Sequence, residues 1–429
     1  MPSSPEARHR RSAHASPPFF LERRTTGAAR LSTGLAVLLA VLAVLGRSTG
    51  VAHKPLVGAG THAPLPIGAV LALTGNANVY GQDQRLGLEL GQTWARTRTV
   101  GRPLAVELED GGSDEAFATA AFNLLIRRGV LALVGPTLSQ PAFAADPIAE
   151  RRGVPVVAPS NTATGIPQIG FFISRVSAQS SVIAPLSLEE ALRREPDLKR
   201  VAVFYAQDDA YSTAETAIFQ RALAGKGLHP VTVQRTQLGD NDFQNPIAAA
   251  LRERPELIVI SAQAVDGGNL VRQLRELGYR GQIVVGNGMN TPNIYPICQQ
   301  WCDGMLIAQA YSPELDTPTN KAFLQLFAER QGGGLPPQLT AQAFTAYQVL
   351  FEASQRLQAR GALDDLTLAE ARLALMKELL AGRYDTPLGP IRFRPDGEVI
   401  QQRFYVAQVK MDGTGRQGRF ALVRDQEEP

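Results

Sequence analysis

The chain has 429 residues, 44% of them hydrophobic, and a formal net charge of +3 at pH 7. This length exceeds what one hydrophobic core usually supports, so we expect two domains of about 150–200 residues each. The positive charge lies in residues 1–52, where seven arginines oppose two glutamates; the remainder carries −2, which argues against a nucleic-acid-binding surface.

An apolar run near the N-terminus is typical of a secretory signal. Residues 31–45 are uncharged and rich in Leu, Val and Ala, follow an arginine-rich stretch, and are short for a membrane span. Gly50-Val51-Ala52 supplies small residues for cleavage. We therefore expect residues 1–52 to be a signal peptide or, alternatively, an uncleaved signal-anchor, and residues 53–65 to be a flexible lead. Either reading predicts export to the periplasm, with a membrane tether in the second case.

Strand and helix patterns alternate between residues 66 and 176. Continuous, β-branched-rich apolar runs predict strands at 67–73, 103–108, 130–134 and 154–158. Between them, helical patterns are expected after Gly81, from a Ser113 N-cap to Gly129, and at 143–151. This alternation predicts a doubly wound parallel α/β sheet.

A second alternation of the same kind follows Arg175. The expected strands and helices are 201–206, 213–224, 229–235, 243–252, 257–262, 268–277, 282–286 and 305–309. Three helices at about 319–331, 340–359 and 367–381 then have no sheet of their own, and β segments follow at 391–393 and 404–409. Because these helices must pack on an existing sheet, the chain should cross between two lobes more than once. We expect lobe 1 to comprise 66–176 and 313–385, lobe 2 to comprise 177–312 and 386–412, and 413–429 to be a charged tail.

Small polar residues lie where the first apolar runs end. Thr137 and Ser139 follow one predicted strand, and Ser160 and Thr162 follow the next. In parallel sheets these carboxyl ends share one edge, where helix N-termini offer free N–H groups. The sequence therefore predicts a site for a small polar or anionic ligand. Alternatively, Ser139, Ser160 and Thr162 are helix N-caps.

The residues that catalysis or metal binding would need are scarce. Beyond the expected signal the histidines are His53, His62 and His229, so Ser–His–Asp and Cys–His schemes lack a base. Nucleotide-binding, P-loop, nucleophile-elbow and zinc-protease motifs are absent from the sequence. We expect no enzymatic activity, no cofactor and no metal.

The only cysteines, Cys298 and Cys302, are four residues apart. No CxxC pair or His/Cys cluster surrounds them, which argues against zinc or iron–sulfur binding. In an oxidising compartment they can form a short-loop disulfide. The alternative is a pair of buried thiols one helical turn apart.

Several short motifs follow one another in a fixed order. They are Leu73-Thr74-Gly75, Tyr80-Gly81, Glu109-Asp110, Gly135-x-x-x-Ser139, Pro155-x-x-x-Pro159-Ser160-x-Thr162, Arg175, Asp242-Phe243, Ala346-Tyr347 and Pro387-Leu388-Gly389-Pro390-Ile391-x-Phe393. This order, over roughly residues 64–410, resembles that of the substrate-binding proteins of branched-chain amino-acid ABC importers, the leucine/isoleucine/valine-binding proteins.

The resemblance implies a type I periplasmic binding fold, in which two doubly wound α/β lobes joined by a three-strand hinge close on a small ligand. It implies that Ser139 and Thr162 hold the ligand's carboxylate through their hydroxyls and Ser160 through its backbone N–H. Tyr80 and Tyr211 resemble aromatic lids, with ordinary packed tyrosines as the alternative. It also implies a monomer that delivers its ligand to permease subunits. The alternative is the sensor component of a signalling system.

The chain departs from the family where amino-acid-binding members carry an acid for the ligand's ammonium group. The loop after residues 282–286 reads Gly286-Asn287-Gly288-Met289-Asn290, without an acid. The amides of Asn287, Asn290 and Gln263 suit a neutral polar end, as in an amide or a hydroxylated or keto acid, because an unpaired buried ammonium is costly. Alternatively, the ligand is an amino acid and Asp209 or Asp266 supplies the charge.

Overall fold

The computed structural model describes residues 63–427, which form two large sheets and one small one. The expected signal, residues 1–52, and residues 53–62 of the expected lead lie outside the described part of the chain. No helix within 63–427 is both long enough and apolar enough to cross a membrane.

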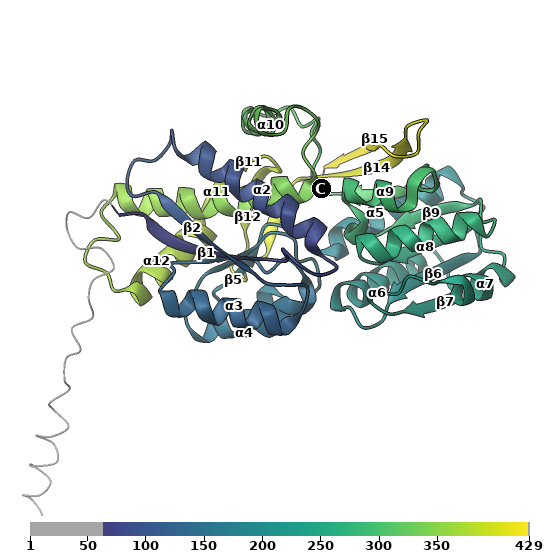
Figure 1. The fold of residues 1–429 in the computed structure, drawn as a ribbon, viewed down its shortest axis with the longest axis horizontal. Helices are drawn as coiled ribbons and strands as arrows, with labels where there is room; N and C mark the ends of the chain where they lie inside the picture. The colour runs from purple at the N-terminus through teal and green to yellow at the C-terminus, as the bar shows by residue number, and fades with distance from the viewer. Residues whose placement is uncertain (1–62, 428–429) are drawn as a thin grey trace, which may run out of the picture. The chain divides into compact units, whose positions relative to one another are not determined.

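The first sheet has five parallel strands in the order β2-β1-β3-β4-β5. The strands are β1 (Leu65–Leu71), β2 (Leu104–Asp110), β3 (Leu133–Val134), β4 (Val156–Ala158) and β5 (Ile173–Arg175). Ile67, Ala69 and Leu71 pack against α2 (Asn78–Ala95) and α11 (Gln338–Ala359). Val70 points the other way, toward α3 (Glu115–Arg128) and α4 (Ser139–Arg151). Helices therefore cover both faces of this sheet (Figure 1), which explains its continuous apolar strands.

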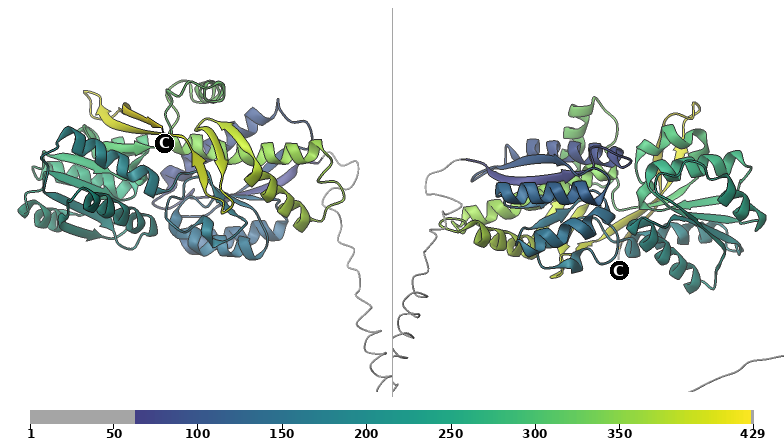
Figure 2. Two further views of the ribbon diagram at one scale, coloured as in Figure 1. Left: turned by 180° about the vertical axis from the view of Figure 1, so that it is seen from behind. Right: turned by 60° about the horizontal axis from the view of Figure 1, so that its bottom comes forward.

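The second sheet has seven strands in the order β15-β14-β10-β9-β8-β6-β7. Its parallel strands are β6 (Val201–Ala206), β7 (Pro230–Thr236), β8 (Leu257–Ser261), β9 (Gln282–Val285) and β10 (Leu306–Gln309). The antiparallel strands β14 (Arg403–Met411) and β15 (Gly418–Glu427) extend one edge. One face packs on α5 (Ser180–Arg194) and α6 (Ala210–Gly225), and the other on α7 (Gln244–Arg252), α8 (Ala264–Glu276) and α9 (Tyr295–Cys298) (Figures 1 and 2).

We refer to the part built on the five-stranded sheet as lobe 1 and the part built on the seven-stranded sheet as lobe 2. The chain passes from β5 into α5 of lobe 2, and returns after β10 to α10 (Pro318–Gln331) and α11, which pack on α2 of lobe 1. It crosses a third time between β13 (Val399–Gln401) and β14. The predicted fold class, two doubly wound α/β lobes joined by three crossovers, is confirmed.

Two C-terminal segments differ from the predicted organisation. Residues 386–401, expected in lobe 2, fall mostly in a separate antiparallel sheet of β11 (Arg383–Thr386), β12 (Gly389–Phe393) and β13, which packs on α10, α11 and α12 (Leu368–Ala381). The strands alternate between buried and exposed residues because helices cover only one face. The other lobe boundaries stay a prediction.

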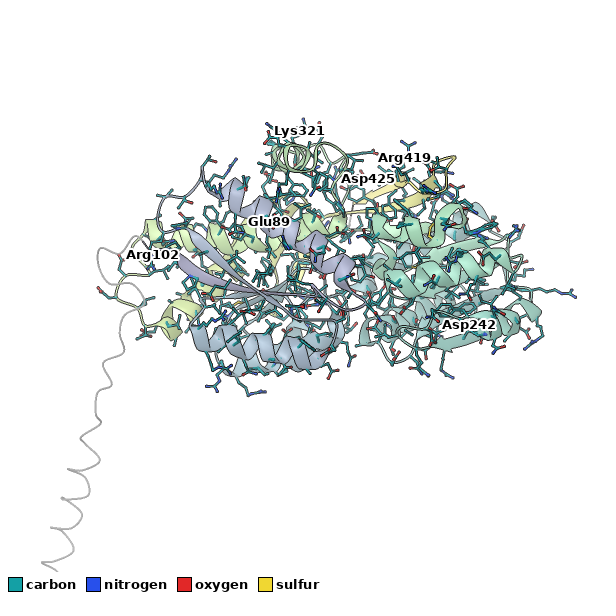
Figure 3. The ribbon with its side chains drawn as sticks, in the orientation of Figure 1. Glu89, Arg102, Asp242, Lys321, Arg419 and Asp425 are labelled. Atoms are coloured by element: carbon teal, nitrogen blue, oxygen red, sulfur yellow. A yellow bond between two sulfur atoms is a disulfide. The ribbon has the colours of Figure 1, made fainter. Side chains whose placement is uncertain are left out.

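The predicted charged tail, residues 413–429, instead contains the strand β15. Its charged residues Arg419 and Asp425 point into solvent (Figure 3). On the same strand Phe420 packs against Tyr295, with ring centroids 5.5 Å apart. The charged residues Arg419 and Asp425 of β15 lie on its exposed face, so they do not prevent the strand from pairing with β14. The predicted tail therefore forms the edge strand of the second sheet.

Candidate functional site

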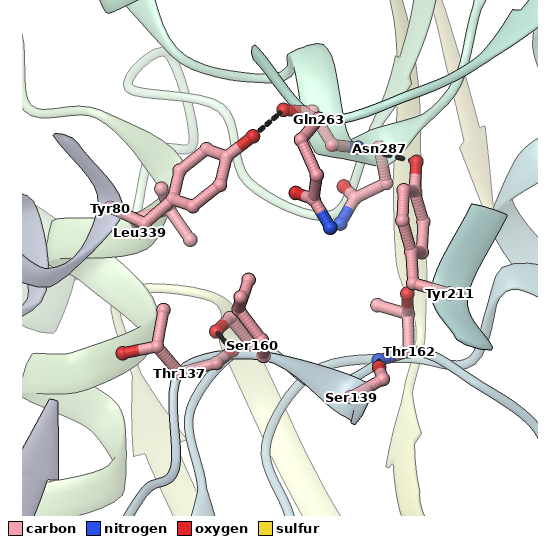
Figure 4. A pocket seen from close by; sticks show the side chains of 11 residues that line it. Tyr80, Thr137, Ser139, Ser160, Thr162, Tyr211, Gln263, Asn287 and Leu339 are labelled. Carbon is pink, nitrogen blue, oxygen red and sulfur yellow. Dashed lines mark hydrogen bonds between the residues drawn. The ribbon is translucent and has the colours of Figure 1, made fainter. Parts of the chain in front are cut away.

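A pocket lies between the two lobes, and polar loops from both converge on it (Figure 4). Its lobe 1 wall comes from the loops after β3 and β4, from Tyr80 of α2 and from Leu339 of α11; its lobe 2 wall comes from α6 and from the loops after β8 and β9. The lining residues are Tyr80, Thr137, Leu138, Ser139, Ser160, Thr162, Tyr211, Gln263, Asn287, Gly288 and Leu339. The structure thus brings together Tyr80, Ser139, Ser160, Thr162, Tyr211, Gln263 and Asn287, which the sequence analysis proposed as ligand contacts, but not Asn290.

The three hydroxyl residues of lobe 1 are not helix N-caps. Ser139 is the first residue of α4, and its Oγ accepts hydrogen bonds from the N–H groups of Thr162 and Ala163, both at 3.3 Å. Ser160 Oγ donates to the Thr137 carbonyl oxygen at 2.6 Å. The side chain of Thr162 has no recorded partner within residues 63–427. The hydroxyls therefore build and line the wall, and the N-cap alternative is wrong.

Gln84 of α2 anchors this wall, and no pattern in the sequence indicated that role. The side chain is fully buried. Its Nε2 donates to Ser160 Oγ and its Oε1 accepts from Thr137 Oγ1, each at 2.6 Å. Because the single hydrogen of the Ser160 hydroxyl is used within the protein, Ser160 can donate to a ligand only through its backbone N–H.

A buried ion pair holds the loop that carries Thr162. Arg175 is fully buried and forms a bidentate pair with Glu398, at 2.8 and 2.7 Å. Its Nη1 donates to the carbonyl oxygens of Asn161 and Ala163, at 3.1 and 2.8 Å. Arg175 therefore fixes the backbone on both sides of Thr162 without touching the pocket. Removing either member of such a pair leaves a buried charge without a partner.

In lobe 2, a buried carboxylate supports Tyr211, which lines the pocket. The Tyr211 hydroxyl donates to Glu215 Oε2 at 2.6 Å and accepts from the N–H of Gly288 at 2.5 Å. Glu215 Oε1 accepts from the N–H of Asn287 at 3.1 Å. Burial raises the pKa of Glu215 to about 7. A Cβ at Gly286 would lie 1.7 Å from Glu215 Oε2, so this contact requires glycine there.

Two amides face the pocket from lobe 2. Asn287 Oδ1 accepts from Gln338 Nε2 at 3.0 Å, and Gln263 Nε2 donates to Asp209 Oδ2 at 3.1 Å. Asn290, which the sequence analysis placed with them, does not line the pocket. It lies behind the wall, where its Nδ2 donates to Gln338 Oε1 at 2.9 Å.

Neither aspartate proposed as an ammonium partner lines the pocket. Asp209 is the N-cap of α6, and its Oδ2 accepts from the N–H and the Oγ of Ser212, at 3.1 and 2.7 Å. Asp266 accepts from the N–H of Gly239 at 3.2 Å, and burial raises its pKa to about 6. Both carboxylates are engaged by lobe 2 itself.

Hydrogen bonds between the lobes close the pocket. The Tyr80 hydroxyl donates to the Gly288 carbonyl oxygen and accepts from the N–H of Ala264, both at 2.5 Å. Burial raises the pKa of Tyr80, so this group stays a phenol. Asp83 Oδ2 accepts from Thr291 Oγ1 and Asn293 Nδ2 at 3.4 and 3.3 Å. The lobes are therefore in contact around the site, as in a closed conformation.

The cysteines lie apart from this pocket. Cys298 and Cys302 are joined by a disulfide and are fully buried in the apolar core beside α8. Within residues 63–427 no group of three or more His, Cys, Asp or Glu side chains is placed to hold a metal ion.

Comparisons with known proteins agree with this architecture. A family model described as periplasmic binding protein matches residues 64–415. The Leu/Ile/Val-binding protein BraC3 of Rhizobium johnstonii is 24% identical over 348 residues, which cover 80% of this chain and 91% of that protein. The leucine binding protein LivK of Thermotoga maritima has a TM-score of 0.75 at 26% identity, covering 84% of this chain and 99% of its own. A solute binding protein of Rhodopseudomonas palustris, solved with 3,4-dihydroxybenzoic acid, has a TM-score of 0.74 at 18% identity, covering 86% and 98%.

Proposed function

The chain belongs to the periplasmic binding protein family, as its motif order predicted, and from this we propose that it is an exported receptor that closes on a small polar ligand and delivers it to an ABC importer. The candidate ligands are amino acids, amides and small carboxylates. The main support is the convergence of both lobes on one pocket. Apart from two tyrosines, none of the residues lining that pocket is ionisable. Such a lining suits reversible binding, and it holds no His, Lys, Asp or Glu that could act as a general base on its Ser and Thr hydroxyls.

The lobe 1 wall suits a carboxylate. The helix α4 begins at Ser139, so its first N–H groups face this end of the pocket and favour an anion. Ser139 Oγ accepts hydrogen bonds from two backbone N–H groups, so its own hydrogen is free to be donated to a ligand. Thr162 adds a second hydroxyl to the same wall. The relatives named above are described with leucine or with 3,4-dihydroxybenzoic acid, both of which carry a carboxylate.

Location and partners follow from membership of the family. We propose that the receptor works in the periplasm as a monomer, either free or tethered by its N-terminal segment, and that permease subunits in the membrane receive the ligand. Rings from both lobes, Tyr80 and Tyr211, cover the pocket, so release requires the lobes to separate. An importer can supply that opening by binding the two lobes.

A ligand screen followed by an uptake measurement tests the proposal. The exported protein is screened by thermal shift against amino acids, short amides and small carboxylates, and we expect at least one to raise the melting temperature, since a ligand stabilises the folded state it binds. Cells lacking the gene should then lose high-affinity uptake of that compound. Normal uptake together with loss of a transcriptional response to the compound would instead favour the sensor function.

A further inference from the structure

We infer that the pocket selects a carboxylic acid whose other polar group is an uncharged hydroxyl or carboxamide rather than an ammonium group, and that Gln338 sets this preference by orienting Asn287. The inference rests on the proposed function and specifies its ligand. It follows from which hydrogen-bonding atoms the protein uses itself and which it leaves for the ligand. Gln338, at the start of α11, does not line this pocket, so it is a positioning residue.

The orientation of Asn287 is fixed from a backbone group. The N–H of Ala310 can only donate, so the Gln338 atom 2.7 Å from it must be the oxygen Oε1. The nitrogen Nε2 of Gln338 then faces Asn287, and the Asn287 atom 3.0 Å from it must be the acceptor Oδ1. This leaves Asn287 Nδ2 as a donor, without a recorded partner in the described chain, in the wall shown in Figure 4.

A second chain of contacts is consistent with the orientation of Gln338. Gln309 Nε2 donates to Asn290 Oδ1 at 2.7 Å, and Asn290 Nδ2 donates to Gln338 Oε1 at 2.9 Å. All four amides in this network are mutually consistent, and reversing Gln338 would set two donors against each other at both Ala310 and Asn290. The network connects the strand end at β10, the start of α11 and the pocket loop, so in the closed form the protein itself orients the donor at Asn287.

Gln263 is oriented by a carboxylate. Asp209 Oδ2 already accepts two hydrogen bonds from Ser212, so it acts as an acceptor toward Gln263 as well, and the Gln263 atom 3.1 Å away must be Nε2. The Gln263 Oε1 atom has no recorded partner among residues 63–427, and the side chain lines the pocket. The lobe 2 wall therefore presents one donor, from Asn287, and one acceptor, from Gln263.

Among residues 63–427, no carboxylate lines the pocket to meet a cation. Both oxygens of Glu215 accept hydrogen bonds within lobe 2, from Tyr211 and Asn287, and Asp209 is engaged as described. A buried ammonium here could donate to Gln263 Oε1 but would face the Asn287 donor and meet no anion, so its lost hydration would be only partly compensated. A hydroxyl or a carboxamide can accept from Asn287 Nδ2 and donate to Gln263 Oε1 at the same time. The rings of Tyr80 and Tyr211 and the Leu339 side chain suit an apolar skeleton between the two ends.

Calorimetric titration of the exported protein with matched acids tests the ligand class. One pair is leucine and 2-hydroxy-4-methylpentanoate, and the other is 4-(aminomethyl)benzoate and 4-(hydroxymethyl)benzoate, so each pair exchanges only an ammonium for a hydroxyl. We expect the hydroxyl member of at least one pair to bind about a hundredfold more tightly, which corresponds to about 2.7 kcal/mol. Equal or tighter binding of the ammonium member in a pair that binds would overturn the inference while leaving a solute receptor in place.

If neither pair binds, the compounds found in the thermal-shift screen show which class of ligand the pocket selects. A hit that carries a cationic group overturns the inference, and a neutral hydroxyl or amide acid supports it. A screen without any hit overturns the proposed function as well.

Gln338→Glu tests the positioning role. A glutamate keeps the acceptor for Ala310 and Asn290 but cannot donate to Asn287, and its carboxylate should draw in the Asn287 NH₂ and turn Oδ1 toward the ligand. We expect the hydroxyl member to lose at least about tenfold in affinity and the ammonium member to gain, whereas a purely structural defect would weaken both alike. Unchanged preference would refute the role of Gln338.

Two further variants protect this test against misfolding. Gln355→Glu makes the same change on the same helix, away from the pocket. Gln355 Oε1 accepts hydrogen bonds from the N–H groups of Val100 and Gly101, so this variant should leave the preference for the hydroxyl member unaltered. Asn287→Asp places an acceptor directly in the pocket wall and should reproduce the gain in ammonium binding. A folded Asn287→Asp protein that still prefers the hydroxyl member would overturn the inference.

Discussion

Residues of one type have different roles in this site. The hydroxyls of Ser139, Ser160 and Thr162 all lie at one pocket wall. Ser160 uses its hydroxyl within the wall, Ser139 accepts two backbone N–H groups, and Thr162 keeps both its donor and its acceptor. The proposed carboxylate contact therefore depends most on Thr162, and Ser160 contributes through the structure of the wall.

Thr162→Ala should weaken binding of the ligand identified by screening by about tenfold to a hundredfold. The lost hydrogen bond to a charged group is worth about 1–3 kcal/mol, and among residues 63–427 the Thr162 side chain makes no hydrogen bond that would be lost with it. Isothermal titration calorimetry measures the change. Ser181→Ala, which removes an exposed hydroxyl on α5, serves as the control. Equal affinities of both variants and the wild type would remove Thr162 from the site.

Glu215→Gln should change how stability depends on pH. Burial raises the pKa of Glu215 from an ordinary value of 4.5 to about 7, so between these pH values the folded protein holds a proton that the unfolded chain has released. The free energy of unfolding of the wild type relative to the variant should therefore fall as pH rises from 4.5 to 7, by roughly 1–3 kcal/mol, and level off above 7.

Urea denaturation of both proteins at pH 5, 6, 7 and 8 measures this difference. Glu329→Gln, an exposed change on α10, provides the reference for a carboxylate in solvent. A constant difference between wild type and Glu215→Gln across the range would show that Glu215 is ionised throughout.

Sequence reasoning located the lining residues but not their supports. The lining residues follow strand ends, and that position can be read from the chain itself. Gln84 lies 76 residues along the chain from its partner Ser160. Asn287 is held by Glu215, 72 residues before it, and by Gln338, 51 residues after it. These three side chains gain their roles only when separate helices meet the pocket loops, so no local pattern indicates them.

At the scale of elements, the start of α2 sets the position of Tyr80. A Cβ on Gly81 would lie 1.9 Å from the carbonyl oxygen of Ala72, so the helix approaches the end of β1 as closely as glycine allows. This close approach carries Tyr80 over the pocket. The helix begins at Asn78, a few residues earlier than its apolar pattern indicated.

Gly81→Ala should push α2 away from β1, destabilise the protein by about 1–3 kcal/mol and weaken ligand binding. The added methyl group meets backbone atoms, which cannot move aside as a side chain can. Thermal melting and calorimetry measure the two effects. Gly225→Ala at the end of α6, where a Cβ would meet nothing within 4 Å, should be close to neutral. A Gly81→Ala protein with native melting temperature and affinity would refute this account of α2.

The disulfide between Cys298 and Cys302 closes a turn next to α8, within the lobe 2 core. We predict that the exported protein carries this bond and that reduction raises its intact mass by about two daltons. Because the loop is so short, the bond should stabilise the fold by only about 2 kcal/mol. Intact-mass spectrometry with and without reductant decides the first point, and an unchanged mass would mean free thiols.

Strands made of one continuous run of buried apolar residues could be predicted most accurately from the sequence. The strand β6 was predicted with its observed bounds, Val201–Ala206, because it is buried on both faces. The helix α5 was not predicted, since Pro185 interrupts the apolar positions Ile183, Leu186 and Leu188. The strands β11 and β13 are short and belong to a sheet that helices cover on one side. Their pairing is set by tertiary contacts that a local pattern does not contain.

At the scale of the whole binding unit, hydrogen bonds connect the lobes at several places around the pocket. They include the Tyr80 hydroxyl with Gly288 and Ala264, Asp83 with Thr291 and Asn293, Gln140 Oε1 with the N–H of Ala210, and Gln338 with Asn287 and Asn290. None of them involves a ligand. Closure therefore has a protein contribution of its own, and a ligand needs only to shift an equilibrium between open and closed forms.

Tyr80→Phe tests this contribution, because it keeps the ring over the pocket and removes only the hydroxyl. The variant leaves the Gly288 carbonyl oxygen and the Ala264 N–H without their cross-lobe partner, and opening exposes both to water. We therefore expect the ligand-free protein to open, with a larger radius of gyration in small-angle X-ray scattering, and the ligand affinity to fall by roughly tenfold. Tyr279→Phe is the matched control, since its hydroxyl lies 2.9 Å from the carbonyl oxygens of Glu256 and Gln282 within lobe 2, and its loss should leave the scattering curve unchanged. If Tyr80→Phe matches the wild type in both scattering and affinity, the hydroxyl does not hold the lobes together, and closure must depend on the contacts of Asp83, Gln140 and Gln338 or on the ligand itself.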